Sequence, residues 1–183
     1  MELVKNFKQS KLIKNLFIAL VGTIILAISS KIKIPFYPVP MTMQTLVVLI
    51  IGIGFGWKLG MATVILYLFE GIIGLPVFSG TPEKGIGIVY FTGPTMGYLI
   101  GFLAAVFFAG KFNYDNNLIK NFLKLTIATS FIYILGLIWL GGIVGWDKPI
   151  FKLGAQPFLL AELFKILLVT FAIKQIKKIK KLF

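Results

Sequence analysis

The residues with the clearest chemical potential are an acid and a base inside an apolar stretch. Glu162 and Lys165 lie in residues 157–173, which are otherwise almost entirely apolar. A spacing of three residues puts both side chains on one helix face, where they can form an ion pair. A charged pair in such surroundings is unfavourable unless it faces a cavity or a partner. We therefore predict contact with a ligand, with the lysine donating and the glutamate accepting N–H groups; a structural ion pair to a neighbouring span is the alternative.

A proline-rich segment precedes a second pair of polar side chains. Residues 31–40 contain three prolines, which block helix and strand hydrogen bonding and hold the chain extended. Thr42 and Gln44 follow, and we place both on the first turn of the next helix as a hydrogen-bonding wall of a cavity. The alternative is a helix cap with a polar interfacial residue.

A third candidate region is the stretch 74–93, which is rich in glycine and lacks a helical pattern. Twenty structureless residues between helices are typical of a lid or a binding loop. Pro94 suits the first position of the next helix, with Thr92 or Gly93 as its cap. Exposed amides at such a helix start can hold an anion or a carbonyl oxygen. A plain helix start with close packing at glycine is the alternative.

Composition determines the kind of scaffold that positions these groups. The chain of 183 residues is 58% hydrophobic, with a mean hydropathy of +0.94, whereas soluble domains are about 45–50% apolar. Because a membrane-spanning helix takes about 20 apolar residues, the chain has room for one membrane domain. Six apolar segments can be marked: residues 12–30, 41–57, 59–73, 94–109, 122–143 and 157–173.

The predicted fold is an all-α integral membrane protein. It is a compact bundle of about six transmembrane helices, with a long outer loop between helices 3 and 4. Residues 1–183 form a single membrane-embedded substrate-binding domain. The second and third segments form an antiparallel helical hairpin that turns around residues 54–60, where glycines are frequent.

Charge predicts how the bundle is oriented. The net charge is +13, from 19 basic residues, all lysine, against six acids. Most lysines flank apolar segments, which disfavours nucleic-acid binding and follows the positive-inside rule. Both termini are therefore predicted to lie in the cytoplasm, with the first span retained rather than cleaved, and the tail 174–181 is predicted to contact anionic membrane lipid. The predicted inside lysines are Lys5, Lys8, Lys11, Lys14, Lys58, Lys111, Lys120, Lys124, Lys174, Lys177, Lys178, Lys180 and Lys181.

Residues that are absent narrow the chemistry. The chain has no cysteine and no histidine, which excludes disulfides, thiol nucleophiles, thiolate metal sites and imidazole chemistry. We therefore predict no catalytic residue, no metal site and no cofactor. An intramembrane enzyme that uses Glu162 and Lys165 as acid and base, or a small channel, are minor alternatives.

Four motifs in order along the chain resemble the BioY family, the biotin-specific substrate-binding (S) components of energy-coupling factor (ECF) transporters. They are Ile34-Pro35 with residues 38–45, residues 71–78, residues 93–99, and Pro157-Phe158 followed by Glu162 and Lys165. The resemblance implies a six-helix protein of the cytoplasmic membrane that is not an enzyme. It implies high-affinity capture of biotin under a mobile outer loop. Uptake is then expected with a membrane coupling protein (T component) and a pair of ATP-binding cassette ATPase subunits. An S component for thiamine or riboflavin is the alternative.

The resemblance also assigns roles to particular residues. The substrate-binding residues that we predict are Glu162, Lys165, Tyr98, Thr42, Gln44, Tyr90 and Phe36. Two positions depart from the family pattern, since the family usually has aspartate at position 162 and glycine at position 96. On the first span, small residues recur every four positions, a pattern that lets helices approach closely and that in the family packs on the coupling protein. These partner-binding residues are Ala19, Thr23 and Ala27.

Overall fold

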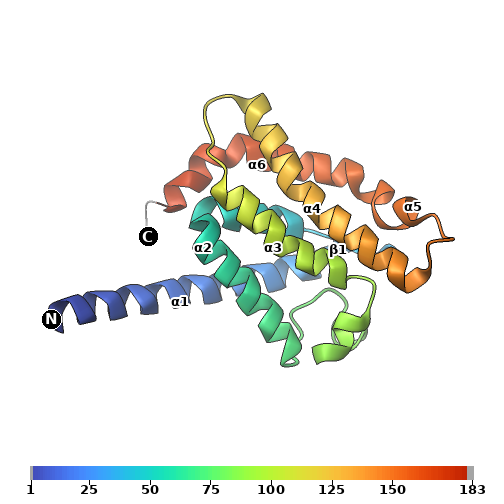
Figure 1. Cartoon of the computed structure of the whole chain (residues 1–183), viewed down its shortest axis with the longest axis horizontal. Coiled ribbons are helices and arrows are strands. Elements are labelled where there is room, and N and C mark those ends of the chain that lie inside the picture. Colours follow the sequence, from blue (N-terminus) through green and yellow to red (C-terminus); the bar gives the residue numbers. More distant parts are fainter. Residues whose placement is uncertain (1, 181–183) are drawn as a thin grey trace.

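The predicted all-α class is confirmed by the computed structural model, which describes the backbone of residues 2–180 and the side chains of residues 11–179 (Figure 1). Lys5, Lys8, Lys180 and Lys181 of the predicted inside set lie outside the described side chains. The helices are α1 (Glu2–Lys31), α2 (Gln44–Ile72), α3 (Met96–Lys111), α4 (Leu118–Val144), α5 (Ile150–Gly154) and α6 (Leu159–Lys180), with short 3₁₀ helices η1 (Gly87–Thr92) and η2 (Gln156–Phe158).

Helix α2 consists of two helices that fold back on each other at Gly56. This glycine has φ of 76° and ψ of 168°, a backbone conformation that residues with a Cβ rarely adopt. After the turn, Gly60 lies against Ile51 and Gly52. Farther along, the Gln44 amide near one end of α2 donates to the Tyr67 hydroxyl near the other. The predicted hairpin is therefore present, and each of the six predicted apolar segments is helical over most of its length.

Among the described residues, four helical stretches are long and apolar enough to cross a membrane. They are Lys11–Lys31, Gln44–Ile72, Leu118–Val144 and Ile150–Ile179, and α3 is a shorter apolar helix. The stretch Gln44–Ile72 contains two of the predicted segments because it reverses at Gly56. The chain is therefore a multi-pass membrane protein.

The folded-back α2 forms the centre of the bundle and contacts α1, α3 and α6, and α3 packs on α4 (Figure 1). Glycines on α3 make this last contact close. A Cβ added at Gly101 would meet Ile132 Cα at 2.6 Å, and one at Gly97 would meet the Trp139 Cβ at 2.3 Å. Because these two glycines are four residues apart on one face of α3, its backbone approaches α4 directly.

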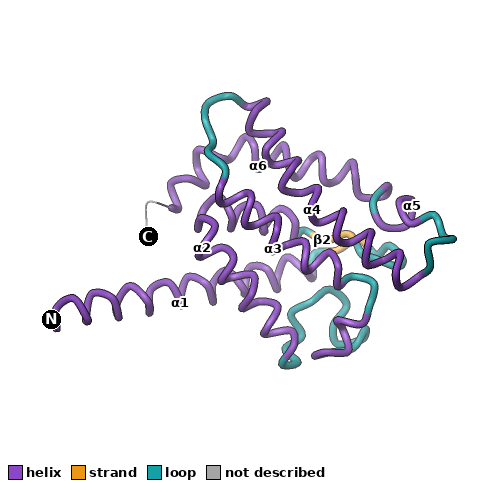
Figure 2. The backbone as a smooth tube through the Cα atoms, in the orientation of Figure 1, coloured by secondary structure: helices purple, strands orange, loops and turns teal. Residues whose placement is uncertain are grey.

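The connection between α2 and α3 is more ordered than the sequence predicts. It contains turns and η1 (Figure 2). Its Phe78 side chain is buried against the rings of Tyr67, Tyr90 and Phe91. This aromatic cluster explains the order, since the loop buries an apolar anchor of its own.

Two sequence-based placements at helix starts are wrong. Helix α3 begins at Met96, so Pro94 lies before the helix rather than at its first position, and Thr95 is the cap residue. The extended segment after α1 forms a small antiparallel hairpin of β1 (Lys33–Ile34) and β2 (Met41–Thr42). Thr42 therefore lies in β2, because its backbone pairs with β1, and Gln44 begins α2.

Candidate substrate-binding site

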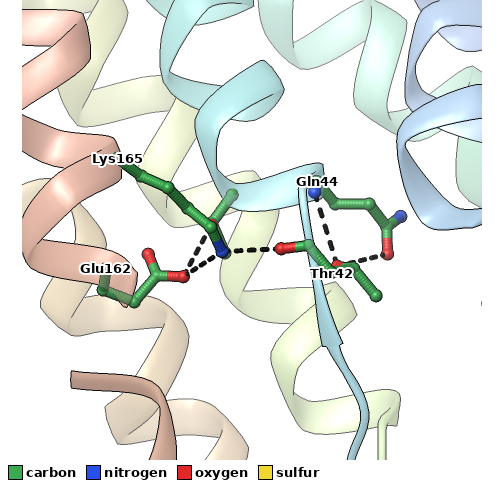
Figure 3. Close-up of polar contacts among 5 residues, drawn as sticks. Thr42, Gln44, Glu162 and Lys165 are labelled. Atoms are coloured by element: carbon green, nitrogen blue, oxygen red, sulfur yellow. Dashed lines mark hydrogen bonds and ion pairs between the residues drawn. The ribbon is translucent and has the colours of Figure 1, made fainter. Parts of the chain in front are cut away.

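Lys165 and Glu162 form a buried ion pair on α6, as their spacing predicts (Figure 3). Lys165 Nζ lies 2.6 Å from Glu162 Oε1, and both residues are about 95% buried, with exposed fractions of 5% and 4%. The ammonium also donates to the Thr42 carbonyl at 2.6 Å and to Thr45 Oγ1 at 3.1 Å. An ammonium has three N–H groups, so these three acceptors occupy all of them.

The two carboxylate oxygens of Glu162 differ in their surroundings. Oε1 accepts hydrogen bonds from Lys165 and from Thr45 Oγ1, at 2.6 and 2.8 Å. Oε2 is buried and has no hydrogen-bond partner of ordinary geometry, although the Tyr133 hydroxyl lies near enough to the Glu162 carboxylate to interact with it as a donor. A buried charged oxygen without a donor is unfavourable, so this atom is available to a ligand N–H group.

Gln44 and Thr42 lie at the start of α2 and contact each other. The Thr42 hydroxyl donates to Gln44 Oε1 at 3.2 Å (Figure 3). The Gln44 amide group donates to the Tyr67 hydroxyl at 2.8 Å, which in turn donates to the Val77 carbonyl at 2.8 Å. These bonds connect the start of α2 to the loop that follows α2.

A cavity of about 60 Å³ lies beside this polar cluster. It is lined by residues from the β1–β2 connection, β2, α2, α3, α4, η2, α6 and the α2–α3 loop. Its lining combines apolar walls with a few polar groups. The lining residues are Val39, Pro40, Met41, Thr42, Gln44, Thr45, Ser79, Tyr90, Thr95, Tyr98, Leu99, Phe102, Ile132, Tyr133, Phe158 and Glu162.

The structure therefore brings five of the seven predicted substrate-binding residues to one cavity: Glu162, Tyr98, Thr42, Gln44 and Tyr90. Lys165 does not line it and is connected to it through Glu162. Phe36 does not line it either; the ring is 38% exposed and packs edge-on against Phe158, which is a wall residue, with ring centroids 5.6 Å apart.

The two tyrosines in the lining use their hydroxyls within the protein. Tyr98 donates to the Gly154 carbonyl and Tyr90 to the Ser79 carbonyl, each at 2.8 Å. Burial raises the pKa of the Tyr90 phenol above its ordinary value, so this group is a neutral donor at physiological pH. Both residues therefore present ring surface to the cavity.

Sequence reasoning missed several lining residues, of which Thr45, Ser79, Thr95 and Tyr133 bear polar groups. The Ser79 hydroxyl is buried and has no hydrogen-bond partner. Tyr133 could have been suspected, because it follows Thr129 by four residues in an apolar span, which puts two polar side chains on one helix face. Ser79 and Thr45 carry no comparable signal.

The small residues of α1 lie mainly inside the molecule. Ala19 and Thr23 are buried against α2, and Thr23 Oγ1 donates to Glu70 Oε1 at 2.8 Å, while Ala27 is partly buried. Close helix approach is thus observed, but between α1 and α2. A contact of these side chains with a partner stays a prediction.

The chain is similar to known proteins along most of its length. Residues 4–181 match the model of the BioY family. The chain is 34% identical to the probable biotin transporter BioY of Pyrococcus horikoshii over 82% of this chain and 85% of that protein. It is 32% identical to the probable biotin transporter BioY of Rickettsia prowazekii over 87% and 81% of the two chains.

A solved structure is also similar. The crystal structure of the S-component for biotin from an ECF-type ABC transporter matches with a TM-score of 0.76 and 25% identity, covering 92% of this chain and 93% of that one.

Proposed function

The chain belongs to the BioY family, and from this premise we propose that it captures biotin with high affinity as the S component of an ECF-type transporter. It is a transport protein rather than an enzyme. We further propose that the whole chain acts as a single substrate-binding domain.

The observation that carries the ligand assignment is a pair of unpaired polar atoms at one cavity. Ser79 Oγ and Glu162 Oε2 are both buried, both lack a hydrogen-bond partner, and both residues line the same cavity. The ureido group of biotin has two N–H donors and one carbonyl acceptor. A carboxylate that accepts N–H and a hydroxyl that donates to a carbonyl match this group, and such charge-assisted bonds are strong in a dry site.

The remaining lining suits the rest of the ligand. Leu99, Phe102 and Ile132 supply apolar surface for the sulfur-containing ring of biotin, and the ring of Tyr98 adds to this wall. We propose that Thr42 and Gln44 supply further polar contacts at the α2 end of the cavity. We propose that the Tyr90 ring forms the wall on the side of the α2–α3 loop. Phe36 would then stabilise the wall through Phe158.

In this site Lys165 orients Glu162. One of its three hydrogen bonds goes to Oε1, and the other two, to the Thr42 carbonyl and Thr45 Oγ1, hold the ammonium in place. Oε2 is then left for the ligand. A direct contact between Lys165 and biotin would require one of these bonds to be exchanged. Glu162 is one methylene longer than the aspartate that is usual in the family at this position. With Lys165 bound to Oε1, its carboxylate still lies at the wall of the cavity.

Biotin entry requires a rearrangement. Pockets that hold ligands of this kind are about 300–1,000 Å³, whereas the cavity is about 60 Å³. The α2–α3 loop contributes Ser79 and Tyr90 to the lining, so we propose that this loop moves when biotin binds.

The purified protein is expected to bind biotin at least about 100-fold more tightly than thiamine or riboflavin, because neither of these presents a ring carbonyl flanked by two N–H donors to the two unpaired polar atoms. Isothermal calorimetry in detergent measures this directly. Each tenfold step corresponds to about 1.4 kcal/mol. Equal affinity for the three vitamins would contradict the biotin assignment.

Two variants test whether the unpaired hydroxyl at the cavity contacts biotin, one at the cavity and a matched control outside it. Ser79→Ala removes the unpaired hydroxyl at the cavity and should weaken biotin binding about 2- to 10-fold, as expected for one neutral hydrogen bond. Thr129 is also buried with an unpaired hydroxyl, but it lines a groove between α4 and α6 rather than the cavity. Thr129→Val should therefore leave biotin affinity unchanged, and an equal effect of both variants would argue against the proposed ligand contact.

We propose that energised uptake requires a membrane coupling protein and a pair of ATPase subunits, as the similarity to an ECF-type S-component suggests. A groove between α1 and the second half of α2 suits an apolar helix of the coupling protein. Small and apolar residues line it, including Leu16, Ala19, Ala62, Leu66 and Phe69. Ala19 of the predicted stripe belongs to this groove, whereas Thr23 and Ala27 are absent from its lining.

Both termini are proposed to be cytoplasmic. The end of the bundle that carries the α3–α4 connection also carries the end of α6, since Lys177 donates to the Tyr114 carbonyl. Lys111 and Lys120 flank the same connection. This basic end suits anionic headgroups of the inner leaflet.

Filling the α1–α2 groove tests the coupling surface. Ala62 is exposed in the groove, and Ala62→Trp should reduce biotin uptake by cells and copurification of the coupling protein by about tenfold or more, while the purified protein binds biotin normally. Ile127→Trp, at an exposed apolar position on α4 outside the groove, is the control and should change neither. Normal uptake by Ala62→Trp would place the coupling surface elsewhere.

A further inference from the structure

We propose that Lys31, the last residue of α1, is a positioning residue that holds the loop segment 77–81 closed over the cavity and so slows ligand release. This inference rests on the proposed function, because the loop covers the site assigned to biotin. It concerns a residue outside the cavity lining, at the opposite end of α1 from the groove described above.

The Lys31 ammonium binds the loop with all of its donors. It donates to the Phe78 carbonyl at 2.9 Å, to the Thr81 carbonyl at 3.1 Å and to Thr81 Oγ1 at 3.0 Å. The two loop residues flank Ser79, which faces the cavity. Lys31 therefore fixes the backbone on both sides of the loop residue that is proposed to contact the ligand.

Neighbouring bonds reinforce the same segment. The Ser30 hydroxyl, on the same turn of α1, donates to the Val77 carbonyl at 2.8 Å. Tyr67 donates to the same Val77 carbonyl, and Tyr90 donates to the Ser79 carbonyl. Each carbonyl from Val77 to Ser79 thus accepts a bond from a side chain, and only the bonds of Lys31 are charge-assisted.

This geometry has a consequence for binding kinetics. The cavity is too small for biotin unless the loop shifts, so opening has to precede or accompany entry and release. Opening that moves residues 78–81 away from α1 breaks the bonds of Lys31. Removing Lys31 should therefore raise the population of the open loop and speed both association and dissociation.

The experiment compares wild type with Lys31→Met and with Lys33→Met. Lys33 is exposed two residues farther on, and its side chain makes none of the described bonds that hold the loop. Lys31→Met should release bound biotin about tenfold faster or more, as expected for loss of charge-assisted hydrogen bonds, whereas Lys33→Met should match wild type. Lys31→Gln keeps donors but loses the charge, and should release biotin at an intermediate rate.

Hydrogen–deuterium exchange of the loop without ligand separates this inference from the proposed function. Amides of residues 77–81 should exchange faster in Lys31→Met than in wild type and Lys33→Met, while exchange in α3 and α4 stays the same. Wild-type exchange and release rates in Lys31→Met would overturn the role of Lys31. If wild type does not bind biotin but Lys31→Met still loosens the loop, the proposed function fails and the anchoring role stands. If Lys31→Met does not fold, the same two readouts on Lys31→Gln decide the matter.

Discussion

Lys165→Met is expected to destabilise the protein by about 3–5 kcal/mol, because it leaves the Glu162 carboxylate as an uncompensated charge in a nearly dry environment. Lys165 and Glu162 are only 5% and 4% exposed, and the lysine supplies one of the two hydrogen bonds that Oε1 accepts. The variant also leaves the Thr42 carbonyl without its ammonium donor. Thermal unfolding in detergent, measured without biotin, should show a strongly lowered Tm.

A double variant isolates the electrostatic part of this effect. Glu162→Gln combined with Lys165→Met removes both charges and should recover most of the lost stability, since a neutral pair needs no compensation. A double variant as unstable as Lys165→Met would show that packing, and not the ion pair, is responsible. If Lys165→Met instead keeps its Tm and loses biotin affinity, Lys165 contacts the ligand directly, as a charged pair inside an apolar segment predicts.

Glu162→Gln alone is expected to weaken biotin binding about 10- to 150-fold, the range for loss of one charge-assisted hydrogen bond. The amide keeps the size of the side chain, but its second terminal atom can become a donor that faces the ligand N–H. Oε2 has no hydrogen-bond partner of ordinary geometry within the protein, so the change removes a ligand bond at this atom. It also leaves the buried Lys165 ammonium without its charged partner, so some loss of stability is expected beside the loss of affinity. Calorimetry with biotin measures the loss.

Glu162→Asp is the matched control for this substitution. Aspartate keeps the charge and is the usual residue of the family at this position, so binding should lie closer to that of wild type than to that of Glu162→Gln. The shorter side chain moves the carboxylate away from either Lys165 or the cavity, and a modest loss is expected. Unchanged affinity in Glu162→Gln would remove Glu162 from the list of ligand contacts.

Features that depend on neighbouring residues along the chain were predictable from the sequence. The apolar segments are long enough to be recognised by composition, and each is helical in the structure. The Glu162–Lys165 ion pair follows from a spacing of three residues on one helix. The reversal at Gly56 follows from a glycine-rich break between two apolar runs, because glycine tolerates the backbone angles of the turn.

The partners of these residues were decided by the tertiary structure. Thr45 contacts Glu162 although 117 positions separate them. Ser79 lines the cavity from a loop whose carbonyls accept hydrogen bonds from Lys31, Ser30 and Tyr67. An apolar helix can be rotated about its axis with little change in its sequence pattern when lipid and protein core are equally apolar. For this reason composition predicts that α1 spans the membrane, but only packing against α2 determines that Ala19 and Thr23 face inward.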